Sequence, residues 1–136
     1  MATRRRARES ALQMLFQYDA SDLAPEKVVD LYRQCFGEGP LPDAFSVELF
    51  LGIARAIETV DATIAKSSDH WRLDRMNRVD RNILRIGVHE ILNADGTPPR
   101  VAINEAVELA KRFGTSESAA FVNGVLDRVA RDRSKL

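Results

Sequence analysis

The chain has 136 residues, 45% of them hydrophobic and 29% charged, a composition that suits one globular domain with a substantial core and excludes overall disorder. No apolar run approaches the roughly 18 residues that cross a bilayer, and an amphipathic segment follows the arginine-rich start, so we expect neither a membrane span nor a secretory signal. The single cysteine, Cys35, excludes an intramolecular disulfide and a paired-cysteine zinc site, and we expect a cytoplasmic protein with no metal and no cofactor.

The first predicted helix begins with a cluster of positive charge. Residues 1–8 hold four arginines and no acidic residue, whereas residues 9–50 hold two basic and eight acidic residues and the whole chain is formally neutral. Apolar residues then repeat with the 3.6-residue period to about Ala20, and Thr3 suits the N-cap position. Positive charge gathered at one end of a neutral protein indicates contact with an anion. The alternative is a solvated, partly frayed terminus, although cations are slightly unfavourable at a helix N-terminus.

Two further helices are predicted before the middle of the chain. One begins near Pro25, which suits a first helical turn, and runs to Gly37. The segment EGPLPD then predicts a loop. After Pro42 an unbroken apolar stripe to about Lys66 predicts a single long helix at the centre of the core. The stripe consists of Phe45, Leu49, Phe50, Ile53, Ile57, Val60 and Ile64.

The second half of the chain predicts three more helices. A short helical or turn segment around residues 70–72 precedes them, and Asp95-Gly96 with Pro98-Pro99 ends the first of the three. No alternating apolar and polar stretch is present, so we expect one all-α domain of about seven helices. Its two helical halves would be about residues 1–66 and 67–136. The three helices span about Arg78–Leu92, Val101–Phe113 and Ser116–Arg131.

Phe16 lies off the apolar stripe of the first helix. At 100° per residue it falls roughly 140° from the centre of that stripe. The same flank carries Leu12, Arg5 and Glu9, so an aromatic ring accompanies an arginine. The alternative is that Phe16 packs against a second neighbouring helix.

Phe121 lies at the border of the buried face of the last helix, about 90° from its centre. Glu117, Gly124 and Arg128 lie beside it. Gly124 costs about 1 kcal/mol relative to alanine in a helix interior, which calls for a reason such as the close approach of another backbone or a ligand. The alternative is a tight crossing of two helices.

Arginines together with aromatic rings outside the core favour binding of single-stranded RNA. Arginines neutralise phosphates, and each ring that stacks an unpaired base contributes about 1–3 kcal/mol. Arginines alone would give a salt-sensitive attraction without sequence preference. We therefore expect Phe16 and Phe121 to flank the arginines on one outward surface.

Three segments of the chain resemble the NusB family of bacterial transcription antitermination factors. The resemblance covers both ends and the middle of the chain and leaves residues from about 22 to 66 weakly matched. It implies an all-helical protein of two subdomains that catalyses no reaction and binds a single-stranded boxA element in the RNA of ribosomal operons. It also implies NusE, a small-subunit ribosomal protein, as a partner, within an antitermination complex of RNA polymerase. The segments are RRRARESALQMLFQYD, VDRNILRIGVHEI and VAINEAVELAKRFGTSESAAFVNGVLDRVA.

The resemblance also implies which residues contact RNA. The arginines of RRRAR would hold phosphates, and Phe16 stands where relatives commonly have tyrosine, so the ring is kept and the hydroxyl is not. Phe121, at the head of FVNGVLD, matches a family position near the RNA. The residues implied are Arg4, Arg5, Arg6, Arg8, Phe16, Asp80, Glu117 and Phe121.

Two of these implied contacts are acidic. Carboxylates of Asp80 and Glu117 would accept hydrogen bonds from base edges and so provide selection among bases. The alternatives are that Asp80 only pairs with Arg81 or Arg85, and that Glu117 only favours the first turn of its helix.

Two other classes of function compete with RNA binding. An enzyme would need a nucleophile with a base, or clustered metal ligands, but His70, His89 and Cys35 are well separated in sequence and lie in no known motif. A related helical domain begins some ribosomal RNA methyltransferases, and we expect no room after it here for their cofactor-binding domain. A self-associating protein would cover the RNA-facing rings in a homodimer, and this alternative stays open.

Overall fold

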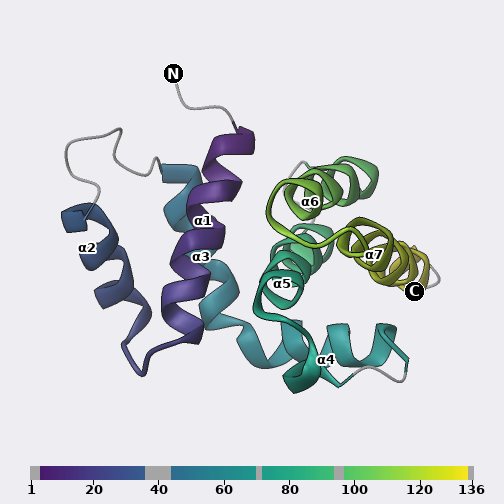
Figure 1. Cartoon of the computed structure of the whole chain (residues 1–136), viewed down its shortest axis with the longest axis horizontal. Coiled ribbons are helices and arrows are strands. Elements are labelled where there is room, and N and C mark those ends of the chain that lie inside the picture. Colours follow the sequence, from purple (N-terminus) through teal and green to yellow (C-terminus); the bar gives the residue numbers. More distant parts are fainter. Residues whose placement is uncertain (1–3, 36–43, 70–71, 94–96, 135–136) are drawn as a thin grey trace. The chain divides into compact units, whose positions relative to one another are not determined.

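The computed structural model is all-α, as predicted, and describes residues 4–35, 44–69, 72–93 and 97–134. Seven α-helices and one 3-10 helix follow one another along this part of the chain (Figure 1). None of its helices is both long and apolar enough to cross a membrane. The elements are α1 Arg4–Asp19, α2 Pro25–Cys35, α3 Ala44–Arg55, α4 Ile57–Ser67, η1 Leu73–Arg75, α5 Arg78–Asn93, α6 Pro99–Phe113 and α7 Ser118–Ser134.

Five predicted helices, now α1, α2, α5, α6 and α7, lie where the sequence patterns place them. Helix α6 begins at Pro99, two residues before the predicted start, because proline suits the first position of a helix. Several predicted features lie outside the described residues. They are the N-cap Thr3, the end of the second helix at Phe36 and Gly37, the EGPLPD loop, His70 and Asp95-Gly96.

The single long helix predicted from Pro42 to Lys66 is wrong, because the structure has two helices there. Ala56 leaves the helical region with φ −108° and ψ 22°, and α4 starts again with a hydrogen bond from Val60 N–H to the Ala56 carbonyl. Neither glycine nor proline lies at this break, and the apolar stripe continues through it. The sequence pattern therefore gives no sign that the helix ends here.

The break between α3 and α4 also divides the chain into two compact units. Unit 1 is Met1–Arg55 and unit 2 is Ala56–Leu136. The division therefore falls at the α3–α4 break, earlier than the boundary near residue 66 that the sequence predicts.

Unit 1 packs α1, α2 and α3 so that each contacts the other two (Figure 1). The ring of Tyr18 meets the completely buried ring of Phe50 edge-on, with centroids 5.9 Å apart. Leu12 is also fully buried, although the sequence places it on the outer flank with Phe16. Helix α1 therefore buries two sides, and its exposed surface is narrower than predicted.

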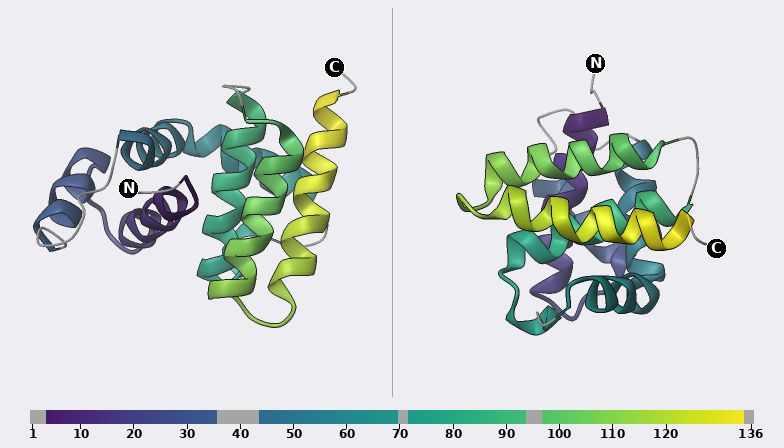
Figure 2. Two further views of the ribbon diagram at one scale, coloured as in Figure 1. Left: turned by 90° about the horizontal axis from the view of Figure 1, so that it is seen from above. Right: turned by 90° about the vertical axis from the view of Figure 1, so that its right-hand side faces the viewer.

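Unit 2 is built around α5, which contacts α4, α6 and α7. Helices α5, α6 and α7 contact one another and lie side by side in the left view of Figure 2. Ten of the 16 residues of α5 are buried, and its apolar members Ile83, Leu84 and Val88 are completely so. Because α5 is enclosed on most sides, its apolar faces belong to the core of the unit.

A buried ion pair joins α4 to α5 inside unit 2. The Arg85 guanidinium donates from Nε to Asp61 Oδ1 over 2.8 Å and from Nη2 to Asp61 Oδ2 over 2.9 Å. It also donates to Asn82 Oδ1 over 2.9 Å. Arg85 is thus fully engaged with α4 and with its own helix, which fixes the orientation of α4 on α5.

Candidate RNA-binding site

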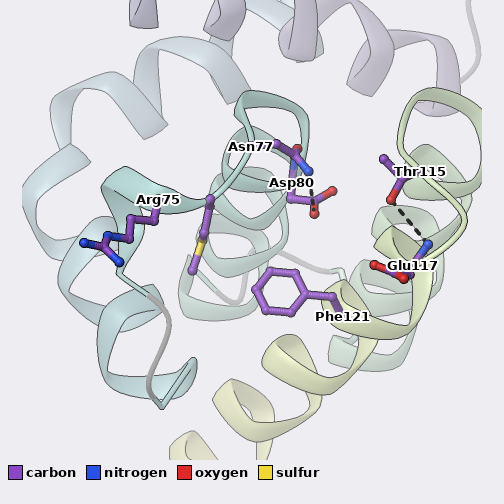
Figure 3. Close-up of a pocket in the computed structure, with 7 residues that line it drawn as sticks. Arg75, Asn77, Asp80, Thr115, Glu117 and Phe121 are labelled. Atoms are coloured by element: carbon purple, nitrogen blue, oxygen red, sulfur yellow. Dashed lines mark hydrogen bonds between the residues drawn. The ribbon is translucent and has the colours of Figure 1, made fainter.

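Three of the predicted RNA-binding residues meet in one pocket of unit 2. The pocket has a volume of about 330 Å³ and lies where the start of α5 faces the turn between α6 and α7 (Figure 3). Asp80, Glu117 and Phe121 all line it, although the first and the last are 41 positions apart in the sequence. It is lined by Arg75, Met76, Asn77, Asp80, Thr115, Glu117 and Phe121.

Asp80 is 8% exposed and is held by the N-cap residue of its own helix. The Asp80 N–H donates to Asn77 Oδ1 over 2.8 Å, and Asn77 Nδ2 donates to Asp80 Oδ2 over 3.1 Å. The first bond is an N-cap, in which the Asn77 side chain accepts from a backbone N–H of the first turn, and the second joins the two side chains. The alternative that Asp80 pairs with Arg81 or Arg85 is wrong, because its bonded partner is Asn77.

The second carboxylate oxygen of Asp80 has a different environment. Oδ1 is buried and accepts no hydrogen bond within the described part of the chain. A buried acceptor without a donor is costly, by about 1–3 kcal/mol and more for a charged group. In Figure 3 this oxygen points across the pocket toward the side where Thr115 and Glu117 lie.

Glu117 is exposed and lies in the turn that leads into α7. Its N–H donates to Thr115 Oγ1 over 3.3 Å, and Thr115 N–H donates to the buried Ser118 Oγ over 2.9 Å. Gly114 permits this turn, since a Cβ there would stand 2.4 Å from Ser118 Oγ. The Glu117 carbonyl accepts from Phe121 N–H, the first such bond of α7, so Glu117 is the residue directly before the helix, where a negative charge still favours the helix start.

Phe121 is half-buried, as its position at the border of the helical face predicts. Its ring extends from α7 into the pocket, below Asp80 in the view of Figure 3. The alternative given for nearby Gly124, a tight crossing of helices, is wrong: a Cβ at Gly124 would meet nothing within 4 Å in the structure as described. The side of α7 that carries Gly124 is therefore open.

The arginines of α1 lie in unit 1 and differ from one another. Arg4, Arg5 and Arg6 are exposed, as expected of residues that meet phosphates. Arg8 is 4% exposed, which contradicts the expectation of a solvent-facing group. Its guanidinium lies 5.7 Å from the centre of the Phe45 ring, and that of Arg4 lies 4.2 Å from the same centre.

The Phe45 ring therefore anchors the start of α1 to α3 through cation–π contacts. The sequence assigns Phe45 only to the core stripe, whereas the ring is half-buried and faces arginines. Phe16 is half-buried too, further along α1. Unit 1 thus offers three exposed arginines and a partly exposed ring on a single helix.

The groups considered for an enzyme do not form a site within the described residues. No three His, Cys, Asp or Glu side chains of that part gather as metal ligands. Cys35 is exposed at the end of α2 in unit 1, and His89 in unit 2 contacts Asn93 on the same helix over 2.9 Å. His70 lies outside the described residues.

Sequence reasoning missed four residues that line the pocket. Asn77 could have been predicted from the sequence, because an asparagine three residues before an aspartate at a helix start is a capping signal. Arg75, Met76 and Thr115 lie in η1 or a turn and carry no periodic pattern, so only the folded chain brings them together.

Three comparisons relate the chain to known proteins. The model of the NusB family matches residues 5–131. The transcription antitermination protein NusB of Sorangium cellulosum is 47% identical over all of this chain and 97% of its own length. The solved structure of T. maritima NusB has 32% identity and a TM-score of 0.82, with 99% of each chain covered. A crystal structure of the antitermination factors NusB and NusE in complex with double-stranded RNA has 27% identity and a TM-score of 0.82, covering 95% of this chain and 96% of that one.

Proposed function

Because the chain belongs to the NusB family, we propose that it binds boxA RNA together with NusE and so supports antitermination on ribosomal RNA operons. In this function it is a transcription antitermination factor and not an enzyme. It would work in the cytoplasm as one RNA-binding domain within the complex that NusE and other factors form with RNA polymerase.

The pocket of unit 2 is the observation that carries this proposal. It combines an aromatic ring, Phe121, with two carboxylates, Asp80 and Glu117, from two separate parts of the chain. A ring stacks an unpaired base, and carboxylates accept hydrogen bonds from the N–H groups on base edges. Because a base must leave its duplex to enter such a pocket, we propose a single-stranded ligand.

The start of α1 would supply the sequence-independent part of the affinity. Arg4, Arg5 and Arg6 are exposed and carry the charge that phosphates require. Phe16 offers a second ring about three turns further along α1. Arg8 takes a different role in the proposal, since its burial over Phe45 suits it to hold α1 in place.

Substitution of Phe121 tests the proposal directly. Phe121→Ala should weaken binding of boxA RNA to the complex with NusE by about 1–3 kcal/mol, the contribution of one stacked base. Phe121→Tyr keeps the aromatic plane and should bind like the wild type, whereas Phe121→Leu keeps apolar bulk and should bind like the alanine variant. Affinities come from fluorescence titration, and circular dichroism checks that each variant is folded.

Three outcomes would contradict the proposal. Equal affinity of Phe121→Ala and the wild type would show that the ring only fills the core. Equal affinity for boxA RNA and for the same strand annealed to its complement would exclude a single-strand site. Failure of the complex with NusE to bind boxA RNA, with light scattering showing a stable dimer of this chain, would favour the self-associating protein instead.

A further inference from the structure

The two sides of the pocket in unit 2 carry opposite charge. Asp80 and Glu117 bring carboxylates to it from α5 and from the turn before α7. Arg75 lines it from η1, and in Figure 3 Arg75 lies on the side of Phe121 opposite to Glu117. A nucleotide has the complementary arrangement. Its base edge carries N–H donors that suit the carboxylates, and its phosphate is an anion that suits Arg75.

The guanidinium of Arg75 can meet an anionic ligand. It is exposed, and the neighbouring carboxylate of Asp74 pairs with Arg72 over 3.2 Å. The turn that presents Arg75 is held to α5, because Arg81 Nη1 donates to the Leu73 carbonyl over 3.3 Å. Arg75 is therefore an exposed cation on an anchored turn at one edge of the pocket.

Asn77 fixes the other side of the pocket. Its amide donates to Asp80 Oδ2, and Oδ1 stays buried with no donor among the residues that the structure describes. A carboxylate oxygen in that position is an acceptor that a small rotation would present to an incoming N–H group. Two carboxylates on this side repel phosphate, so a nucleotide fits the pocket in one orientation only.

We propose that Arg75 and Asn77 complete a site for one nucleotide of the bound RNA, in which Arg75 holds the phosphate and Asn77 positions Asp80 to accept from an N–H group on the base. The inference rests on the proposed function, and it adds an orientation of the strand and a selection among bases. A base lacking an amino group at the edge that faces Asp80 would bind less well.

Arg75→Gln tests the phosphate contact, with Arg100→Gln as its matched control. Arg100 is also an exposed arginine of unit 2, but it lies at the far end of α6, about 20 Å of helix from the turn at Thr115. Arg75→Gln should weaken boxA binding to the complex with NusE about threefold to tenfold and lower the slope of log affinity against log salt by about 0.7. Arg100→Gln should change neither.

Asn77→Asp tests the positioning of Asp80. Aspartate caps a helix as well as asparagine does, so the fold is kept, but it has no amide N–H to donate to Oδ2. The probes are boxA RNAs in which one base at a time lacks its exocyclic amino group, with inosine for guanosine, purine riboside for adenosine and zebularine for cytidine. At one position the wild type should prefer the natural base, and both Asn77→Asp and Asp80→Asn should lose that preference.

The outcomes separate this inference from the proposed function. If the wild-type complex binds boxA RNA and Phe121→Ala weakens it, but Arg75→Gln behaves like Arg100→Gln, the phosphate assignment is overturned and the proposed function stands. A preference among bases that survives in Asn77→Asp overturns the positioning role, because a purely structural effect would weaken all the RNAs alike. If the wild-type complex binds none of the RNAs, the proposed function fails as well.

Discussion

Single glycines show most directly how the surroundings of a residue decide the effect of a substitution. Gly124 is exposed within α7, and a Cβ there meets nothing within 4 Å. Gly124→Ala should therefore raise the free energy of unfolding by about 0.5–1 kcal/mol, because alanine loses less backbone entropy in a helix. Urea denaturation followed by circular dichroism measures this. A loss of stability would show that Gly124 has a neighbour that the described residues do not include.

Gly87 is the matched comparison, since it also lies within a helix. A Cβ at Gly87 would stand 2.5 Å from Leu126 Cδ1 and 3.3 Å from Leu126 Cγ, and Leu126 is completely buried. Overpacking of about 1–3 kcal/mol should outweigh the helical gain, so Gly87→Ala should destabilise. The double variant Gly87→Ala with Leu126→Ala should lose less free energy of unfolding than the sum of the losses in the two single variants. Simple additivity would contradict this contact.

These two glycines also show what the sequence reveals about single residues. The helical cost of glycine marks Gly124 for attention, but the close crossing of α5 and α7 is at Gly87, whose contact lies on a different helix. The same limit applies to the pocket. The resemblance predicts Asp80, Glu117 and Phe121 as RNA contacts, and helical periodicity also singles out Phe121, whereas Arg75 carries no motif and is found only from its position in the fold.

At the scale of elements, the ion pair between α4 and α5 should be the most sensitive contact of unit 2. Removing the Asp61 carboxylate removes the two charge-assisted hydrogen bonds that the buried Arg85 guanidinium makes to it. Asp61→Ala should therefore cost about 3 kcal/mol, the lower end of the range for a broken buried pair, because the Asp61 side chain is partly exposed. Urea denaturation monitored by circular dichroism gives the value.

Asp127→Ala is the control for this prediction, since its carboxylate pairs with the exposed Arg131 one turn along α7. Exposed pairs contribute about 0.2–1 kcal/mol, so this variant should stay close to the wild type. A loss for Asp61→Ala no larger than that of Asp127→Ala would show that Arg85 finds another partner when α4 moves.

Helix positions were predictable because their apolar faces repeat with the helical period, and helix breaks were predictable only where they have a chemical cause. Gly114 and Pro99 mark real ends of helices. Ala56 interrupts the stripe from Phe45 to Ile64 with a change of backbone angles alone. The break comes from the separate packing of α3 in unit 1 and α4 in unit 2, which no local pattern records.

At the scale of the whole molecule, the proposed function predicts that each unit contacts RNA. Unit 1 supplies exposed arginines on α1, and unit 2 supplies the pocket that holds Phe121. Arg5→Ala should weaken boxA binding to the complex with NusE and lower the salt slope by about 0.7, because one phosphate contact is lost. Arg33→Ala, an exposed arginine of α2 in the same unit, should leave the slope unchanged.

Stoichiometry then decides whether the two units act on the same strand. If a single strand contacts both the arginines and the pocket, calorimetric titration should give one RNA per complex. Arg5→Ala and Phe121→Ala should then both weaken the affinity for that RNA. Two RNAs per complex, each sensitive to only one of the variants, would mean that the units bind independently. An unchanged salt slope in Arg5→Ala would remove Arg5 from the phosphate contacts and shift the electrostatic part of binding to other arginines, of which Arg75 has a defined position beside the pocket.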